Sequence, residues 1–294
     1  MTPARRERLF SVVLILPAFL FVLIFAFFPI VHSFWLSLHR IVLGLPGLGE
    51  PFVGAENYIE LLNDRVALRA VKNTFLFVFV STFFEILFGL LIALVIHERF
   101  KGRGIVRASV LVPWAVPTVV SSQMWRFIFN DKYGLINFLF FGGDVNAYRA
   151  WLADPVYAFV AIVVADVWKT SAFAALLILA GLQAIPEDLY EAAKVDGAGW
   201  WQRFFKITLP LLRPALLIAL LFRTMDAFRV FDLVFVMTQG GPADSTNVLQ
   251  FYGYKKIFAE GMMGYGSAVS VLVFLISFVV SMFYVRMIGK RMFR

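Results

Sequence analysis

Residues 186–210 read PEDLYEAAKVDGAGWWQRFFKITLP, and apolar stretches at about 157–182 and 209–236 flank this polar segment. A helix of about 20 apolar residues is long enough to cross a lipid bilayer. Comparable stretches occur at about 9–31, 74–96, 105–129 and 265–288. The sequence therefore predicts an all-α integral membrane protein with six transmembrane helices and a polar loop at about 184–208 between the fourth and the fifth.

The polar loop has the residues of a helix, a turn and a second short helix. Pro186 suits the first position of a helix, and the two acidic residues after it suit the positive end of the helix dipole. Asp196 and Gly197 supply the turn, because glycine adopts backbone conformations that are closed to other residues. The small residues Ala192 and Ala193 would leave one surface of the first helix open to close approach by another protein.

The composition agrees with a membrane protein and excludes several other classes. Of the 294 residues 61% are hydrophobic and 34 are Phe, whereas soluble domains are roughly half apolar. The net charge is +8, but the basic residues form short clusters between apolar stretches, which excludes nucleic acid as a partner. Cys is absent and the three His residues have no ligand spacing, so we expect no metal site.

Basic residues concentrate on one side of the six predicted helices, and such an excess marks cytoplasmic loops. The clusters are Arg5, Arg6 and Arg8; Arg99, Lys101, Arg103 and Arg107; and Arg286, Lys290, Arg291 and Arg294. We therefore expect both termini and the loop at 184–208 to be cytoplasmic, with loops 32–73, 130–156 and 237–264 facing outward. No low-complexity linker interrupts residues 1–294, which predicts a single domain.

Residues 222–232 read FRTMDAFRVFD and place charges at a spacing of three directly after an apolar run. The four charged residues are Arg223, Asp226, Arg229 and Asp232. A charge at the centre of a bilayer costs about 2.5–3.5 kcal/mol, so these side chains must be paired, hydrated or both. In a continuous helix Arg223, Asp226 and Val230 share one face, while Asp232 lies on nearly the opposite side. The segment predicts either the wall of an aqueous passage or an ion ladder that fixes helix packing.

The polar loop is similar to the EAA signature of the membrane subunits of binding-protein-dependent ABC importers. The matching residues, at the spacing of that signature, are Glu191, Ala192, Ala193, Gly197, Ile207, Leu209 and Pro210. A G-x-x-N-Y pattern at 54–58 and a T-x-G-G-P turn at 238–242 resemble the carbohydrate permeases of the maltose and glycerol-phosphate type. The pair VWKTSAF at 167–173 and FRTMDAFR at 222–229 is most similar to trehalose and maltose importer permeases.

The resemblance implies a permease subunit of an ATP-driven importer in a bacterial or archaeal cytoplasmic membrane. Such a subunit forms half of the translocation pathway and works by alternating access, here for a sugar such as the disaccharides trehalose or maltose. Its implied partners are a second homologous permease, two cytoplasmic ATPase subunits and an extracytoplasmic sugar-binding protein. The residues implied to couple it to an ATPase are Glu191, Ala192, Ala193, Asp196 and Gly197.

The chain contains no G-x-x-x-x-G-K-[ST] phosphate-binding loop. We therefore expect it to have no enzymatic activity and no cofactor of its own, with ATP and Mg²⁺ bound by the partner ATPase.

The resemblance also implies a sugar site on the fourth and fifth helices. Aligning the fourth helix on Trp168 places Asp166, Lys169, Thr170 and Phe173 at the sugar-contact positions of the maltose permease. Positions 166, 170 and 173 share one helical face and offer a hydrogen-bond acceptor, a hydroxyl and an aromatic ring. The predicted substrate-binding set is completed on the fifth helix by Arg223, Asp226 and Val230.

Other charged residues leave alternatives open. Arg229 and Asp232 are expected to pair with each other or with the partner subunit. Glu85 is a carboxylate within the second predicted helix, either a site residue or the partner of a cation such as Lys169 or Arg126. A proton-coupled or ion-coupled secondary transporter, in which buried carboxylates titrate, is an alternative function, although no inverted internal repeat is visible. An assembly subunit without a passage is a third.

Overall fold

The computed structural model describes residues 3–45, 47 and 49–292, and every regular element in these ranges is helical apart from two isolated β-bridges. Arg294, one of the basic residues used above to orient the chain, lies outside the described residues. Five helices are long and apolar enough to span a membrane, or up to six if one bent pair is counted as a single span. The predicted all-helical membrane fold is confirmed. The contacts divide the chain into two compact units, Met1–Asp64 with Gly253–Leu272 and Arg65–Tyr252 with Val273–Arg294.

The first unit contains the N-terminal span and the outer-loop motif. Helix α1 (Pro3–Val22), a π-helical segment (Leu23–Phe27) and α2 (Phe28–Ser37) follow each other directly and provide the apolar span Val12–Ser37. Helix α3 (Glu56–Asn63) carries the motif residue Asn57, whose buried amide donates to the carbonyls of Ser37 at 2.8 Å and His39 at 3.0 Å. The G-x-x-N-Y pattern therefore ties α3 to the chain just beyond α2.

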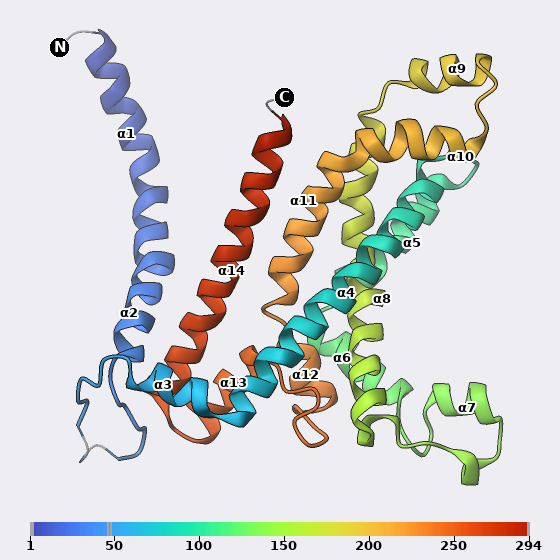
Figure 1. Ribbon diagram of the computed structural model, residues 1–294. Coiled ribbons are helices and arrows are strands. Elements are labelled where there is room, and N and C mark those ends of the chain that lie inside the picture. The colour runs from blue at the N-terminus through green and yellow to red at the C-terminus, as the bar shows by residue number, and fades with distance from the viewer. Residues whose placement is uncertain (1–2, 46, 48, 293–294) are drawn as a thin grey trace. The chain divides into compact units, whose positions relative to one another are not determined.

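Three long helices form the centre of the second unit: α4 (Arg65–His97), α8 (Pro155–Gln183) and α11 (Leu209–Ala227), each in contact with the other two (Figure 1). Small residues let their backbones approach closely, as is usual between membrane helices. A Cβ atom on Gly89 would lie 2.7 Å from that of Ala174, and one on Gly181 would lie 2.3 Å from that of Ala215. The glycines therefore fix how closely α8 packs against α4 and α11.

The predicted third span, 105–129, is two helices rather than one. Helix α5 (Arg103–Ala115) ends and α6 (Thr118–Ile128) begins at an angle of 91° to it. Pro117 has no backbone N–H and disfavours a helical conformation in the residue before it, and Val116 is extended with φ −70° and ψ 131°. Pro117 is therefore the site of a complete break in the predicted span.

The fifth predicted span, 209–236, begins earlier and ends earlier than expected. A continuous helical run, Trp200–Ala227, comprises α10 (Trp200–Arg203), a π-helical segment (Phe204–Thr208) and α11. The second short helix predicted in the polar loop is therefore the first part of the fifth span. After Ala227 the chain turns, and α12 (Asp232–Met237) is a separate helix.

The first part of the polar loop forms as predicted. Helix α9 (Glu187–Val195) is followed by a turn in which Gly197 has a φ of +77°. The side chains of Arg99, which follows α4, and Glu187 form an ion pair of 2.8 Å. The basic loop after the second span and the polar loop therefore lie at the same end of this unit.

The remaining elements are two short helices and the last span. Helix α7 (Leu135–Phe141) lies between α6 and α8, and α13 (Leu249–Tyr254) leads toward the last span, α14 (Met263–Met292). The segment just after the T-x-G-G-P turn is fastened to α4, because the Asn73 amide donates to the carbonyls of Asp244 at 2.8 Å and Asn247 at 3.0 Å.

Candidate functional site

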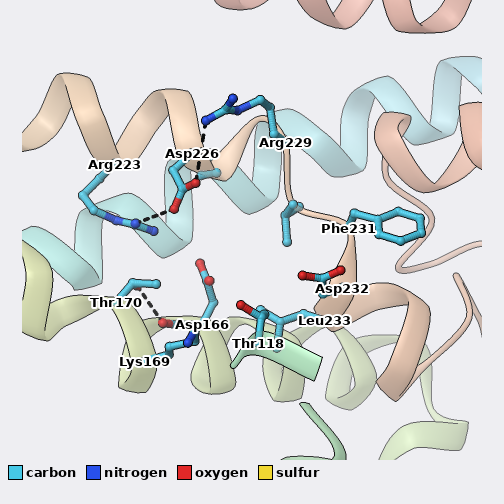
Figure 2. Close-up of a pocket in the computed structure, with 12 residues that line it drawn as sticks. Thr118, Asp166, Lys169, Thr170, Arg223, Asp226, Arg229, Phe231, Asp232 and Leu233 are labelled. Carbon is cyan, nitrogen blue, oxygen red and sulfur yellow. Dashed lines mark hydrogen bonds and ion pairs between the residues drawn. The ribbon is translucent and has the colours of Figure 1, made fainter. Parts of the chain in front are cut away.

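A polar cavity of about 120 Å³ lies inside the second unit, where two helix breaks meet (Figure 2). One break lies between α5 and α6, and the other between α11 and α12. Its lining residues are Thr118, Asp166, Lys169, Thr170, Arg223, Asp226, Ala227, Arg229, Val230, Phe231, Asp232 and Leu233. Non-helical backbone is tolerated at membrane depth where it is buried in protein or lines a hydrated space, and here it lines the cavity.

A chain of two ion pairs crosses from α4 to the cavity. Arg223 Nε donates to Glu85 Oε2 at 2.6 Å, and Arg223 Nη1 donates to Asp226 Oδ2 at 2.7 Å. The exposed fractions of these side chains are 0% for Glu85, 3% for Arg223 and 58% for Asp226. The guanidinium is thus buried between two carboxylates, and the Asp226 carboxylate is the group that faces the cavity. Lys169 or Arg126 was expected as the cation that pairs with Glu85, but the structure shows that it is Arg223.

The break after Ala227 changes the geometry predicted for the rest of the charge ladder. Val230 lines the cavity from the turn, not from the helical face that it was expected to share with Arg223 and Asp226. Asp232 was expected on the opposite side, yet it begins α12 and lines the same cavity. Arg229 Nη2 lies 4.0 Å from Asp226 Oδ1, so the ion pair found for Arg229 is with Asp226 and not with Asp232.

Helix α8 supplies Asp166, Lys169 and Thr170 to the opposite wall (Figure 2). The Asp166 side chain is buried, and its Oδ2 atom accepts no hydrogen bond from a donor in the described residues. The Thr170 hydroxyl donates to the main-chain carbonyl of Asp166 at 2.6 Å. Asp166 therefore lines the cavity as a largely buried carboxyl group, whereas the hydroxyl proton of Thr170 is used within the helix.

Lys169 is occupied by the backbone at the first helix break. Its ammonium group donates to the carbonyl of Trp114 at 3.4 Å and to the carbonyl of Val116. These carbonyls belong to the end of α5, which Pro117 deprives of a continuing helix. Lys169 therefore holds the end of α5 against α8 and, with it, places Thr118 at the cavity.

Six of the seven predicted substrate-binding residues line this cavity, and Phe173 is the exception. Its ring stacks on Trp114, with ring centres 5.7 Å apart, and meets Phe222 edge-on at 6.5 Å. The polar lining residues Thr118, Arg229 and Asp232 were missing from the predicted set, as was Glu85, which does not line the cavity but pairs with Arg223. Thr118 directly follows Pro117, so a break at that proline would have indicated it, whereas nothing local in the sequence pairs Glu85 with Arg223.

The residues predicted to couple with an ATPase lie on α9 and the turn after it. Glu191, Ala192, Asp196 and Gly197 are exposed, and Ala193 is half-buried. The Ala198 amide donates to the Ala193 carbonyl at 2.9 Å, which closes the turn. The hydroxyl groups of Tyr190 and Thr208 lie 3.0 Å apart and connect α9 to the start of the fifth span.

Charged side chains at a helix break inside a membrane-spanning bundle are typical of transport proteins, where such residues mark the path of the substrate. The chain belongs to the family described as binding-protein-dependent transport system inner membrane component, which matches residues 85–294. The predicted family, the permease subunits of ABC importers, is thereby confirmed.

Two relatives and one solved structure illustrate the family. The chain is 47% identical over 271 residues to the trehalose/maltose transport system permease protein MalF of Thermococcus litoralis, covering 92% of this chain and 90% of the relative. It is 38% identical over 284 residues to the trehalose transport system permease protein SugA of Mycobacterium tuberculosis, covering 96% of this chain and 90% of the relative. A bacterial ABC transporter involved in the import of the acidic polysaccharide alginate has the same fold, with a TM-score of 0.82 at 24% identity, covering 98% and 97% of the two chains.

Proposed function

We propose that this chain is one permease half of an ATP-driven importer for a neutral disaccharide such as trehalose or maltose. The observation that carries the proposal is the cavity, because the exposed carboxylate of Asp226 lines one wall and the carboxyl group of Asp166 lines the opposite wall. Carboxylates are strong acceptors for the hydroxyl groups that cover a sugar. The two relatives, permeases of a trehalose/maltose and of a trehalose transport system, support trehalose or maltose as the substrate.

The charges of the cavity favour a neutral sugar over an acidic one. Three cations and three carboxylates line it, in equal number: Lys169, Arg223 and Arg229, with Asp166, Asp226 and Asp232. Two of the cations are already engaged, Lys169 by main-chain carbonyls and Arg223 by two carboxylates. Arg229 is left, and its neighbour is Asp226. An acidic sugar would therefore find few free donors and several repelling oxygens.

The size of the cavity supports the role of a half-site. About 120 Å³ is well below the roughly 300–1,000 Å³ of sites that enclose a small molecule. A second homologous permease, placed by approximate two-fold symmetry, would supply the remaining contacts. The two permeases would then alternate between inward-facing and outward-facing forms around the sugar.

The exposed surface of α9 supports coupling to a separate ATPase. Glu191 and Ala192 present a charged and a small side chain on a helix outside the apolar spans, beside a turn that needs glycine. We place this surface and both termini in the cytoplasm, in accord with the basic residues Arg99 and Lys101 at the same end of the unit. ATP and Mg²⁺ would bind to the two ATPase subunits, and the sugar-binding protein would dock on the opposite side.

Reconstitution tests this proposal directly. The complex, purified from its native host with its ATPase and partner permease, is placed in liposomes with ATP inside and the sugar-binding protein outside. Uptake of labelled trehalose or maltose should require both ATP and the binding protein. Uptake driven by a proton gradient in the absence of ATP would instead identify a secondary transporter.

The variant Asp166→Asn separates a passage from an assembly role. It keeps the size of the side chain and one acceptor oxygen but replaces the other carboxyl oxygen by an amide group that can only donate. We expect normal assembly of the complex and a tenfold or greater loss of uptake, corresponding to about 1.4 kcal/mol. Unchanged uptake by this variant and by Asp226→Asn would show that the cavity is not the sugar path.

A further inference from the structure

The segment between α6 and α8 carries an apolar helix that no contact described above explains. Helix α7 reads LINFLFF, and Asn137 is its one polar residue. Four of its side chains are at least half exposed: Leu135, Phe138, Leu139 and Phe140. In Figure 1 the helix lies to one side of the N-terminal end of α8. So much exposed apolar surface on a short helix marks an interaction site.

Asn137 turns this apolar surface outward. Its side chain is fully buried, and its amide donates to the carbonyls of Asn130, Asp131 and Arg149. Its Oδ1 atom accepts from the Arg149 N–H at 3.0 Å and from Trp151 Nε1 at 2.7 Å. The polar side of α7 is thus locked onto the chain that joins α6 to α8, and the apolar side has to face whatever lies around the bundle.

The segment that joins α6 to α8 also sets the depth of α7 relative to the membrane, because it leads directly into the first turn of α8. Asp154 caps α8 by accepting from the amides of Val156 at 2.8 Å and Tyr157 at 3.0 Å. The apolar sequence of α8 begins at once, and its side chains at Val156 and Val160 are exposed. The exposed apolar surface of α7 therefore lies next to the first turns of a membrane span.

Aromatic and basic side chains around α7 match the chemistry of a lipid headgroup layer. The Trp151 ring lies between Phe140 at 6.0 Å and Tyr157 at 5.2 Å. Trp and Tyr gather at the membrane–water boundary, where their rings meet both apolar and polar surroundings. Lys132 is exposed, and the Arg149 guanidinium lies 5.7 Å from the centre of the Phe141 ring. Cations beside an apolar face are typical of helices that lie in the plane of the interface.

We propose that α7 lies in the interfacial layer of the bilayer, with Leu135, Phe138, Leu139 and Phe140 among the lipid acyl chains. Held there through Asn137, it anchors the N-terminal end of α8, the helix that carries Asp166 and Thr170 into the cavity. The partner is the lipid surface itself. This inference concerns the α6–α8 connection alone and does not depend on which substrate the cavity binds.

The absence of cysteine from the chain permits a direct test with spin labels. Single variants Leu139→Cys and Phe140→Cys are labelled in the complete complex, whose partner subunits have been made cysteine-free. The complex is placed in phosphatidylcholine vesicles that contain phosphatidylglycerol. Collision of each label with oxygen, which concentrates in lipid, and with a water-soluble nickel chelate is then measured. Lys132→Cys is the aqueous control, and Phe25→Cys, within the apolar N-terminal span, is the bilayer control.

We expect labels at positions 139 and 140 to show an oxygen-to-nickel collision ratio close to that at position 25 and well above that at position 132. ATPase activity of each labelled complex confirms that it is assembled. Nickel accessibility equal to that at position 132 would place α7 in water and overturn the proposal. Labels shielded from both reagents would mean that a protein covers α7, as would labels whose accessibility falls only when the sugar-binding protein is added.

Discussion

Replacing Arg223 by methionine should strongly destabilise the protein, because Arg223 is the buried partner of the Glu85 carboxylate. The change removes the donor to Glu85 Oε2, and Oε1 of the same carboxylate has no donor among the described residues. Because Glu85 is fully buried, the variant leaves an uncompensated charge in the bundle, which costs about 3–5 kcal/mol. That cost is a large part of the roughly 5–15 kcal/mol by which folded proteins are stable.

A matched set of variants isolates this charge effect. Arg229→Met removes a guanidinium from the same ladder, but that side chain is 66% exposed and lies 4.0 Å from its partner, so its loss costs at most about 1 kcal/mol. Glu85→Met combined with Arg223→Met removes both buried charges and should recover most of the stability, because apolar residues replace a buried ion pair at little cost. Arg223→Met combined with Asp226→Leu should not recover it, because Glu85 remains charged and unpaired.

Membrane abundance and the thermal aggregation temperature of the purified complex measure these effects. Abundance should fall sharply for Arg223→Met, stay near the parent level for Arg229→Met and return for the Glu85/Arg223 double variant. The recovered double variant should still transport poorly, since Asp226 has lost the guanidinium that orients it. The reasoning fails if Arg223→Met matches the parent protein, or if the double variant is no more stable than Arg223→Met.

Three further changes test other parts of the structure. Gly197→Ala strains a turn with a φ of +77° by about 1–3 kcal/mol. Uptake and ATPase binding should therefore fall while membrane insertion persists, and full uptake would contradict a coupling role for this turn. Lys169→Met leaves the Trp114 and Val116 carbonyls without their donor at a cost of about 1–3 kcal/mol, so the thermal aggregation temperature should fall, and an unchanged temperature would argue against the clamp. Gly181→Val forces apart α8 and α11, where a Cβ would lie 2.3 Å from Ala215, and should lower the thermal aggregation temperature, whereas Gly143→Val, with open space around its Cα, should not.

The long apolar stretches and the turn at Gly197 could be predicted because each depends on a few adjacent residues. Hydropathy over some 20 residues is enough to identify a span, and the Asp196–Gly197 pair is enough to identify a turn. Pro117 is visible in the sequence, but neither the 91° angle of the break nor the donation from Lys169 on another helix to the Val116 carbonyl has a local signal.

The break after Ala227 had no local signal at all. Residues 228–231 read FRVF and contain neither Gly nor Pro, so a continuous helix was the natural expectation. Asp232 was therefore placed on the wrong side, and Val230 lines the cavity from a turn instead of from the predicted helical face.

The pairing of Glu85 with Arg223 could not be predicted because it joins residues 138 positions apart. Which face of α4 meets which face of α11 is set by small residues along several helices, not by the charges themselves. Phe173 shows the converse: spacing alone put it on the face of Asp166 and Thr170, but Trp114 at the end of α5 covers it.

Because the helical run Trp200–Ala227 is continuous, the fifth span can move as one rigid body, so that a tilt at one end displaces the other. Its 28 residues contain no break between the turn beside Gly197 and the carboxylate of Asp226. At 1.5 Å per residue the distance from Trp200 to Asp226 is about 39 Å, so a tilt of about 10° at one end moves the other by about 7 Å. That displacement exceeds the length of every hydrogen bond and ion pair around the cavity. A small rotation imposed on α9 would therefore be enough to change the width of the cavity between Asp226 and the α8 residues on its opposite wall, without any change within the helical run itself.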